Sequence, residues 1–203
     1  MKHFIQCTCS AVVIGTLVAG LAFASEKSDS KKVDPKMEEM MKRMEAASKV
    51  GAEHKALDSL VGDWNAEVKM WMDRSAPPNV SKGIAKRTWI LGNRFVQEEF
   101  KGEFMGKPFH GMGLTGYDNM KKKYNNFWVD DVSTAMFTNE GTAEKGGKTI
   151  TFEGKYDCAM TGEKDKPSKQ IVRILSRDKH VFEMYDPSKG ENAKMMEITY
   201  TRK

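Results

Sequence analysis

The first apolar pattern in the chain after its N-terminal segment has the period of a helix. Methionines recur at positions i, i+3, i+4 and i+7, namely Met37, Met40, Met41 and Met44. This spacing places side chains on one face of an α-helix. Asp34 suits the cap position and Pro35 the first helical position, and Gly51 ends the pattern. We therefore predict a Met-rich amphipathic helix over residues 35–53.

After a second short helical stretch at 54–60, the apolar period changes from near 3.6 to 2, which is typical of half-buried strands. Turn-forming pairs such as Pro77-Pro78 and Gly92-Asn93 separate the segments. The predicted strands are 64–72, 80–91, 94–104, 109–117, 123–129, 133–142, 149–156, 168–175, 180–185 and 193–202.

The connections between these strands are too short for helical crossovers, so the sheet is predicted to be an antiparallel meander. About ten such strands close most easily into an up-and-down barrel, which also removes exposed edges. A two-sheet sandwich or an open sheet is the alternative. Gly62 and Trp64 at the head of the first strand are typical of lipocalin-like barrels, in which the indole plugs the closed end. The fold class is thus an all-β lipocalin-like barrel behind one or two short helices.

The N-terminus has the pattern of a secretory signal. Lys2 precedes an apolar run over 11–24, and Ala22-Phe23-Ala24 fits a cleavage site after Ala24. The run is short for a membrane span and contains Gly15 and Gly20. We expect a signal peptide (1–24), a polar tether (25–34), the helix (35–53) and a barrel domain (54–203), located in the periplasm or secreted, with no stable membrane span.

Charge and cysteine content narrow the classes of partner. The chain has 33 Lys and Arg against 28 Asp and Glu, a net charge of +5. The charges are interleaved and no Arg-aromatic stripe stands out, so we expect no nucleic-acid partner. Cleavage would remove Cys7 and Cys9 and leave Cys158 alone, which excludes an internal disulfide in the mature chain.

Four separated motifs resemble one bacterial family. They are residues 54–64 (HKALDSLVGDW), 89–94 (WILGNR), 113–118 (GLTGYD) and 196–200 (MEITY). In this order they resemble the family known as domain of unknown function 1579, over about 150 residues. The resemblance implies a calycin-like or lipocalin-like fold with no established activity.

Haem-binding nitrobindin-like barrels also begin with glycine and tryptophan on the first strand. They carry a proximal histidine near the chain end, whereas residues 193–203 contain none, and Ala66 and Val68 stand where the haem group has glycines. We therefore expect no haem.

No zinc-ligand spacing, GxSxG elbow or phosphate-binding loop occurs in the sequence. A catalytic site assembled in space at the barrel mouth stays an alternative. The favoured function is binding of a small, partly apolar ligand inside the barrel. Strand alternation and neighbouring glycines suggest candidate lining residues, with core packing as the alternative for the tryptophans: Arg87, Trp89, Phe95, Glu99, His110, Trp128 and Phe137. The facing of Arg173 and Glu197, inward or outward, is open.

The methionine stripe has two interpretations. Thioethers bind soft Cu(I), and they also form adaptable apolar contact surfaces. No His or Cys completes a ligand set in this segment, so we favour a contact surface and do not expect Cu(I). The alternative to ligand binding is accordingly an envelope interaction module that docks a protein partner through Met37, Met40, Met41 and Met44 or through the barrel rim.

Overall fold

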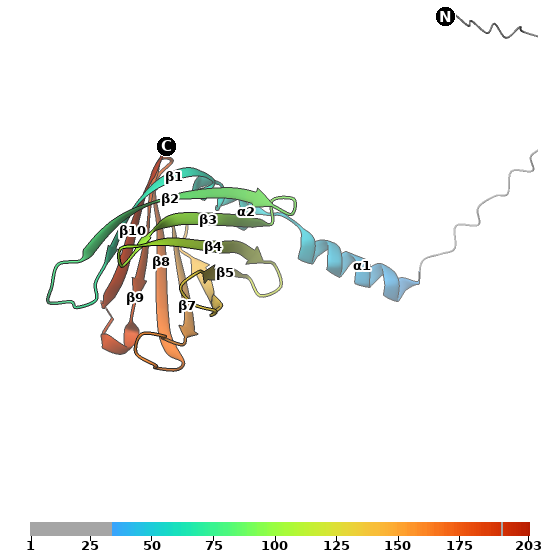
Figure 1. Ribbon diagram of the computed structural model, residues 1–203. Helices are drawn as coiled ribbons and strands as arrows, with labels where there is room; N and C mark the ends of the chain where they lie inside the picture. Colours follow the sequence, from blue (N-terminus) through green and yellow to red (C-terminus); the bar gives the residue numbers. More distant parts are fainter. Residues whose placement is uncertain (1–33, 192) are drawn as a thin grey trace, which may run out of the picture.

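The computed structural model describes residues 34–191 and 193–203, and shows a β-barrel with a helix standing away from it (Figure 1). The predicted signal peptide lies outside the described residues. The helical elements are α1 (Pro35–Ser48), α2 (Ala52–Lys55), η1 (Asp58–Leu60) and η2 (Pro187–Lys189). The strands are β1 (Gly62–Met70), β2 (Asn79–Ile90), β3 (Phe95–Phe104), β4 (Lys107–Asp118), β5 (Lys123–Asp130), β6 (Phe137–Ala143), β7 (Thr149–Tyr156), β8 (Lys166–Ser176), β9 (Lys179–Tyr185) and β10 (Lys194–Arg202).

The ten strands form a closed antiparallel barrel in which each strand pairs with its neighbours in the chain and β1 pairs with β10. The prediction of an up-and-down barrel is confirmed. The largest difference in strand limits is at β6, which begins at Phe137 and not at residue 133. The Asp130 carboxylate accepts hydrogen bonds from the backbone N–H groups of Val132 (3.1 Å) and Ser133 (3.3 Å), and this turn holds the chain out of the sheet.

One end of the barrel is closed by Trp64, which is fully buried together with Leu57. The indole Nε1 donates to the Leu60 carbonyl (2.9 Å), and the Arg202 guanidinium lies 4.2 Å from the indole ring. Gly62 is required beside this contact, since it has φ 135° and a Cβ there would come within 2.2 Å of the Arg202 side chain. Trp64 is thus the plug of the closed end.

The register fixes which side chains face the lumen. On β1 the residues Trp64, Ala66 and Val68 are buried, and the intervening residues are exposed. Cross-strand partners share a face, so the inner set continues through Ala85 on β2 and Phe100 on β3. The other end of the barrel, where β1 meets β2 and β7 meets β8, carries no such plug among the described residues. We call it the open end.

Helix α1 has no buried residue and points away from the strands (Figure 1). Within the described chain, its hydrogen bonds to the barrel come from its C-terminal end. Arg94 Nη2 donates to the Ser48 carbonyl (2.9 Å), and Asn119 Nδ2 donates to the carbonyls of Ala47 (3.0 Å) and Lys49 (2.7 Å). None of the helices in the described residues is long and apolar enough to span a membrane.

Candidate functional site

Glycines on the inner wall allow aromatic rings to lie flat against it. A Cβ on Gly111 would come within 2.2 Å of the Trp128 indole, and one on Gly113 within 3.1 Å of it. A Cβ on Gly141 would come within 2.8 Å of the Phe152 ring. Any larger residue at these positions would push the ring into the lumen. The glycines therefore let these rings pack directly against the strands.

The flat rings join into a continuous apolar surface on β3, β4 and β5, which we call the aromatic wall: Phe100, Phe104, Phe109 and Trp128. Trp128 stacks on Phe109 at 6.5 Å between ring centres, and Phe100 meets Phe109 edge-on at 5.9 Å. Phe109 and Trp128 keep part of their surface accessible although they face inward. These two rings are therefore not packed on all sides.

The wall opposite is polar. In a ring of ten strands β8 lies five places from β3, so their inner faces are opposed across the lumen. Ser168 and Gln170 of β8 are 4% and 8% exposed, and we call them the polar strip. Neither Ser168 Oγ nor Gln170 Oε1 has a hydrogen-bond partner among the residues that the structure describes. A buried polar atom without a partner costs about 1–3 kcal/mol, which a bound ligand could recover.

A charged pair stands at the open end of the polar strip. Lys166 Nζ lies 2.9 Å from Glu163 Oε2 and 3.0 Å from Asp186 Oδ2. Hydrogen bonds to Glu163 and then Asp186 raise the pKa of Lys166 well above its usual value. Burial opposes ionisation of Asp186, yet hydrogen bonds from Ser188 and Lys166 outweigh it and lower its pKa. Lys166 and Asp186 are therefore ionised, and the single cation at this end of the strip is shared by two carboxylates.

Four side chains form a floor cluster above the plug: Arg87, Glu98, His180 and Tyr200. Arg87 Nη2 donates to Glu98 Oε2 (2.9 Å), and its Nη1 contacts His180 Nε2. The Tyr200 hydroxyl donates to Glu98 Oε1 (3.1 Å). The Arg87 guanidinium lies 4.3 Å from the centre of the Tyr200 ring, on which His180 stacks at 4.5 Å. The cluster thus links β2, β3, β9 and β10.

The imidazole in this cluster is neutral. Burial, followed by the charges of Arg87 and Arg202, lowers the pKa of His180 to about 2. Because Arg87 donates to Nε2, the proton of the neutral ring is on Nδ1, which finds no partner in the described part of the chain. Burial and the Glu98 carboxylate raise the pKa of Tyr200. Arg87 and Glu98 therefore carry the charges of the floor, and they cancel.

Four of the seven sequence-predicted lining residues lie on the inner side of the barrel. Arg87 belongs to the floor cluster and Trp128 to the aromatic wall, while Phe137 faces Tyr156 near the open end at 5.9 Å. Trp89 lies at the closed end, where its Nε1 donates to Asp58 Oδ1 (2.8 Å). Contact of these residues with a ligand stays a prediction.

The other three, Phe95, Glu99 and His110, do not line the lumen, which corrects that prediction. On β3 the inward residues are Val96 and Phe100, so the odd-numbered positions face outward. On β4 the neighbours of His110, Phe109 and Gly111, face inward, and Gly111 and Gly113 lie beneath Trp128. The glycines that suggested a cavity beside His110 are therefore themselves the inner positions, and the imidazole is exposed.

Sequence reasoning missed the polar strip and most of the floor cluster. All of the missed residues except Ser168 stand two positions from an apolar inner neighbour, as Gln170 does from Val172 and His180 from Phe182. Extending the alternation of inward and outward side chains along β8 and β9 predicts that Ser168, Gln170 and His180 face the lumen. The pairing that completes the floor cluster joins Arg87 and His180 across 93 positions of sequence, and no local signal carries it.

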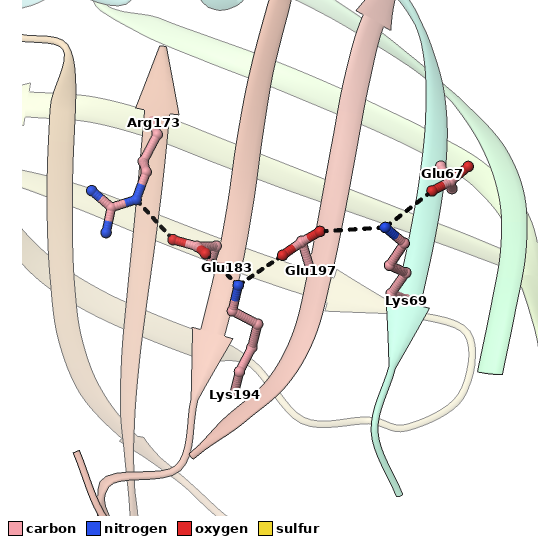
Figure 2. A network of polar contacts seen from close by, with 6 residues as sticks. All are labelled: Glu67, Lys69, Arg173, Glu183, Lys194 and Glu197. Carbon is pink, nitrogen blue, oxygen red and sulfur yellow. Dashed lines mark hydrogen bonds and ion pairs between the residues drawn. The ribbon is translucent and has the colours of Figure 1, made fainter. Parts of the chain in front are cut away.

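The outer face of β8, β9, β10 and β1 carries alternating charges (Figure 2). Arg173 Nε lies 2.9 Å from Glu183 Oε2, and Lys194 Nζ lies 2.7 Å from Glu197 Oε2. Lys69 continues the row at 3.7 Å from Glu197 Oε1. Arg173 and Glu197 therefore face outward, where they belong to a balanced surface network and not to the ligand site.

Two hollows open on the outside of the barrel. One of about 450 Å³ lies at the closed end beside Asp58 and Arg177, and one of about 680 Å³ lies on the outer face of β3 to β7 beside Leu114 and Phe127. The buried polar atoms without partners that the structure describes line neither hollow. We therefore take the lumen as the candidate site.

Comparison with known proteins identifies a family and a fold. The family described as "Protein of unknown function (DUF1579)" matches residues 49–202. No curated protein sequence matches the chain.

Two solved structures share the barrel. Rv2717c from M. tuberculosis is 15% identical, with a TM-score of 0.55 over 76% of this chain and 99% of its own. The S-type phycobiliprotein lyase CPES from Guillardia theta is 10% identical, with a TM-score of 0.51 over 79% of this chain and 96% of its own. Identities this low show likeness of fold alone.

Proposed function

Since the chain belongs to the DUF1579 family, whose description assigns no activity, we propose a function from the geometry of the lumen: the barrel binds one small, partly apolar molecule, which enters at the open end. The observation that carries this proposal is the pairing of opposite walls. Aromatic rings lie flat on glycines along one wall, and Ser168 and Gln170 hold unpartnered buried polar atoms on the other. A few polar groups on an apolar wall are what a ligand pocket needs.

The charges in the lumen restrict the chemistry of the ligand. Arg87 is paired with Glu98, and Lys166 with Asp186 and Glu163, so neither cation is left unpaired for an anionic ligand. A neutral molecule avoids the cost of burying a further charge. We therefore propose a flat apolar body against the aromatic wall and one uncharged hydrogen-bonding group facing the polar strip.

The likeness to the phycobiliprotein lyase supports this proposal at the level of fold alone, and we carry no lyase activity over to this chain.

We also propose that the protein works outside the cytoplasm, because residues 1–24 have the pattern of a secretory signal. Cell fractionation tests this part separately, and recovery of the uncut chain in the cytoplasm would contradict it.

The binding proposal is tested with N-phenyl-1-naphthylamine, a neutral molecule in which a phenyl and a naphthyl ring are joined by one N–H donor. The titration follows the rise of its fluorescence with the full mature chain and with two single variants of β8. Ser168→Phe puts a ring into the lumen, and Lys169→Phe puts the same ring on the outer face. Saturable binding to the natural chain, loss in Ser168→Phe and retention in Lys169→Phe are expected.

Melting temperatures of both variants show whether each is folded. If Ser168→Phe unfolds, Gln170→Leu replaces it, because leucine fits a similar volume and removes the unpartnered oxygen. Equal binding by the inner and outer variants would place the probe outside the lumen and overturn the proposal.

A further inference from the structure

Helix α1 is an amphipathic helix whose apolar face packs on nothing in the described chain. Its four stripe methionines, Met37, Met40, Met41 and Met44, are 47%, 47%, 59% and 64% exposed. No His or Cys stands beside the stripe, but thioether sulfur is itself a ligand of Cu(I). The sequence favours a contact surface for this stripe. The barrel does not supply that contact, because the helix has no buried residue and is held at its C-terminal end by Arg94 and Asn119.

We propose that the stripe formed by Met37, Met40, Met41 and Met44 is a binding site for a single Cu(I) ion. Thioether sulfur is a soft, neutral ligand that selects Cu(I) over the harder divalent ions. The proposal is independent of the ligand in the lumen, since the site lies on a different element and shares no residue with it.

Helix geometry brings the sulfurs together. Side chains three and four positions apart lie about 5–6 Å apart at Cβ. Long side chains in a helix lean toward its N-terminus, so Met41 leans over Met37, and Met44 leans over Met40 and Met41. The flexible thioether arms let three sulfurs converge on one ion without a change in the backbone. Unlike cysteine, methionine does not form disulfides outside the cytoplasm, where we propose that the chain works.

The charged side chains of α1 leave the stripe free. Lys42 Nζ lies 2.7 Å from Glu38 Oε1, and Arg43 pairs with Glu39. At about 100° per residue both pairs fall on the side of the helix away from the methionines. No charge of these two pairs therefore stands over the sulfurs, and the remaining charged residues of the helix, Lys36 and Glu45, lie at the two edges of the stripe.

Substitution by leucine separates this site from a packing surface. Leucine keeps the apolar face and the helix propensity and removes the sulfur. The test variant carries Met37→Leu, Met40→Leu, Met41→Leu and Met44→Leu in the full mature chain. The matched control carries four leucines at exposed loop methionines of the barrel: Met72→Leu, Met105→Leu, Met136→Leu and Met160→Leu.

Cu(I) affinity is measured without oxygen, in ascorbate, by competition with the chromophoric chelator bicinchoninate. One ion per natural chain is expected, with affinity about a hundredfold weaker in the helix variant and unchanged in the loop variant. X-ray absorption of the loaded protein should show sulfur as the main neighbour of copper. Affinity should also be nearly constant between pH 5 and pH 8, because thioethers do not titrate.

Circular dichroism checks that both variants keep the natural helix content. Binding by the helix variant as tight as by the natural chain overturns the proposal, as does failure of the natural chain to compete with micromolar bicinchoninate. Equal weakening in the helix and loop variants would also overturn it, because copper would then be held by scattered surface sulfur.

Discussion

The closed end and the open end of this barrel differ in whether their buried polar groups have hydrogen-bond partners. At the closed end Trp64 is fully buried, its N–H is bonded to Leu60, and Arg202 both covers the indole and donates to the Val61 carbonyl at 2.9 Å. Toward the open end, buried oxygens of Ser168 and Gln170 have no partner in the described chain. The difference teaches that the plug satisfies the polar group it buries, whereas the polar strip leaves two buried oxygens for which a ligand could supply partners.

The loops extend this contrast. Each of the first four loops at the open end carries one strongly exposed methionine, at 49%, 73%, 74% and 64%: Met72, Met105, Met136 and Met160. Methionine is a flexible apolar side chain that adapts to differently shaped partners. An apolar, adaptable rim is consistent with the entry of a partly apolar molecule there.

The largest expected loss in the free energy of unfolding comes from a substitution at the plug. Trp64→Ala removes a fully buried indole, its hydrogen bond and its contact with Arg202. We expect a loss of about 4 kcal/mol in the free energy of unfolding, measured by urea denaturation. A loss below about 1 kcal/mol would show that the closed end does not hold the barrel together.

The next effect is at the floor cluster. Arg87→Met leaves the Glu98 carboxylate without its cation, and we expect a cost of about 3 kcal/mol in unfolding free energy. The double variant Arg87→Met with Glu98→Gln should recover at least about 1 kcal/mol of that loss, because no charge is then left unpaired. Additive losses in the two single variants would argue against a coupled pair.

Because the imidazole of His180 is neutral in the folded chain, the free energy of unfolding should depend on pH. The pKa of His180 is about 2 in the folded chain and near 6.5 when unfolded, so between these values the unfolded state binds one more proton. The stability that this group contributes is complete above pH 6.5 and falls as pH decreases, by about 1.4 kcal/mol per pH unit.

Comparison with His180→Gln isolates this effect, because the acidic groups are the same in both proteins. The difference in unfolding free energy between the two should change with pH below 6.5 and be flat above it. A difference that is flat from pH 4 to pH 8 would mean that His180 has the same pKa in the folded and unfolded chains, and a difference that changes only above pH 6.5 would mean that the folded imidazole is protonated.

The smallest expected change in the free energy of unfolding is a gain and not a loss. Gln170→Leu removes a buried oxygen that lacks a partner, and we expect it to stabilise the ligand-free protein by about 1 kcal/mol while weakening ligand binding. Thermal unfolding and the fluorescence titration are run on the same sample. Destabilisation would show that Gln170 is part of the structural half of the barrel.

Much of the fold could be read from the sequence, because its signals are local. Gly62 and Trp64 mark the first strand, and turn residues separate segments of period 2. The face of each strand was harder to predict, because a shift of one residue inverts it. Strand alternation correctly predicts that Phe95 and Glu99 share a face of β3, but that face is the outer one.

The candidate site was less predictable because its parts come from distant strands. Strand alternation places Arg87 on one face with Trp89, but the partners of Arg87, namely Glu98, His180 and Tyr200, are set by barrel closure. Whether Ser168 and Gln170 find hydrogen-bond partners depends on everything packed against β8, and no sequence pattern reports that. Their lack of partners is a property of the folded barrel.

Native mass spectrometry of the mature chain, purified from its own cells under mild conditions, tests the central claim most directly. We predict a small-molecule adduct on the natural protein that is absent from Ser168→Phe and retained by Lys169→Phe. An adduct of equal occupancy on both variants would contradict a binding site in the lumen. So would a folded natural chain that carries no adduct and binds no added apolar probe at any probe concentration.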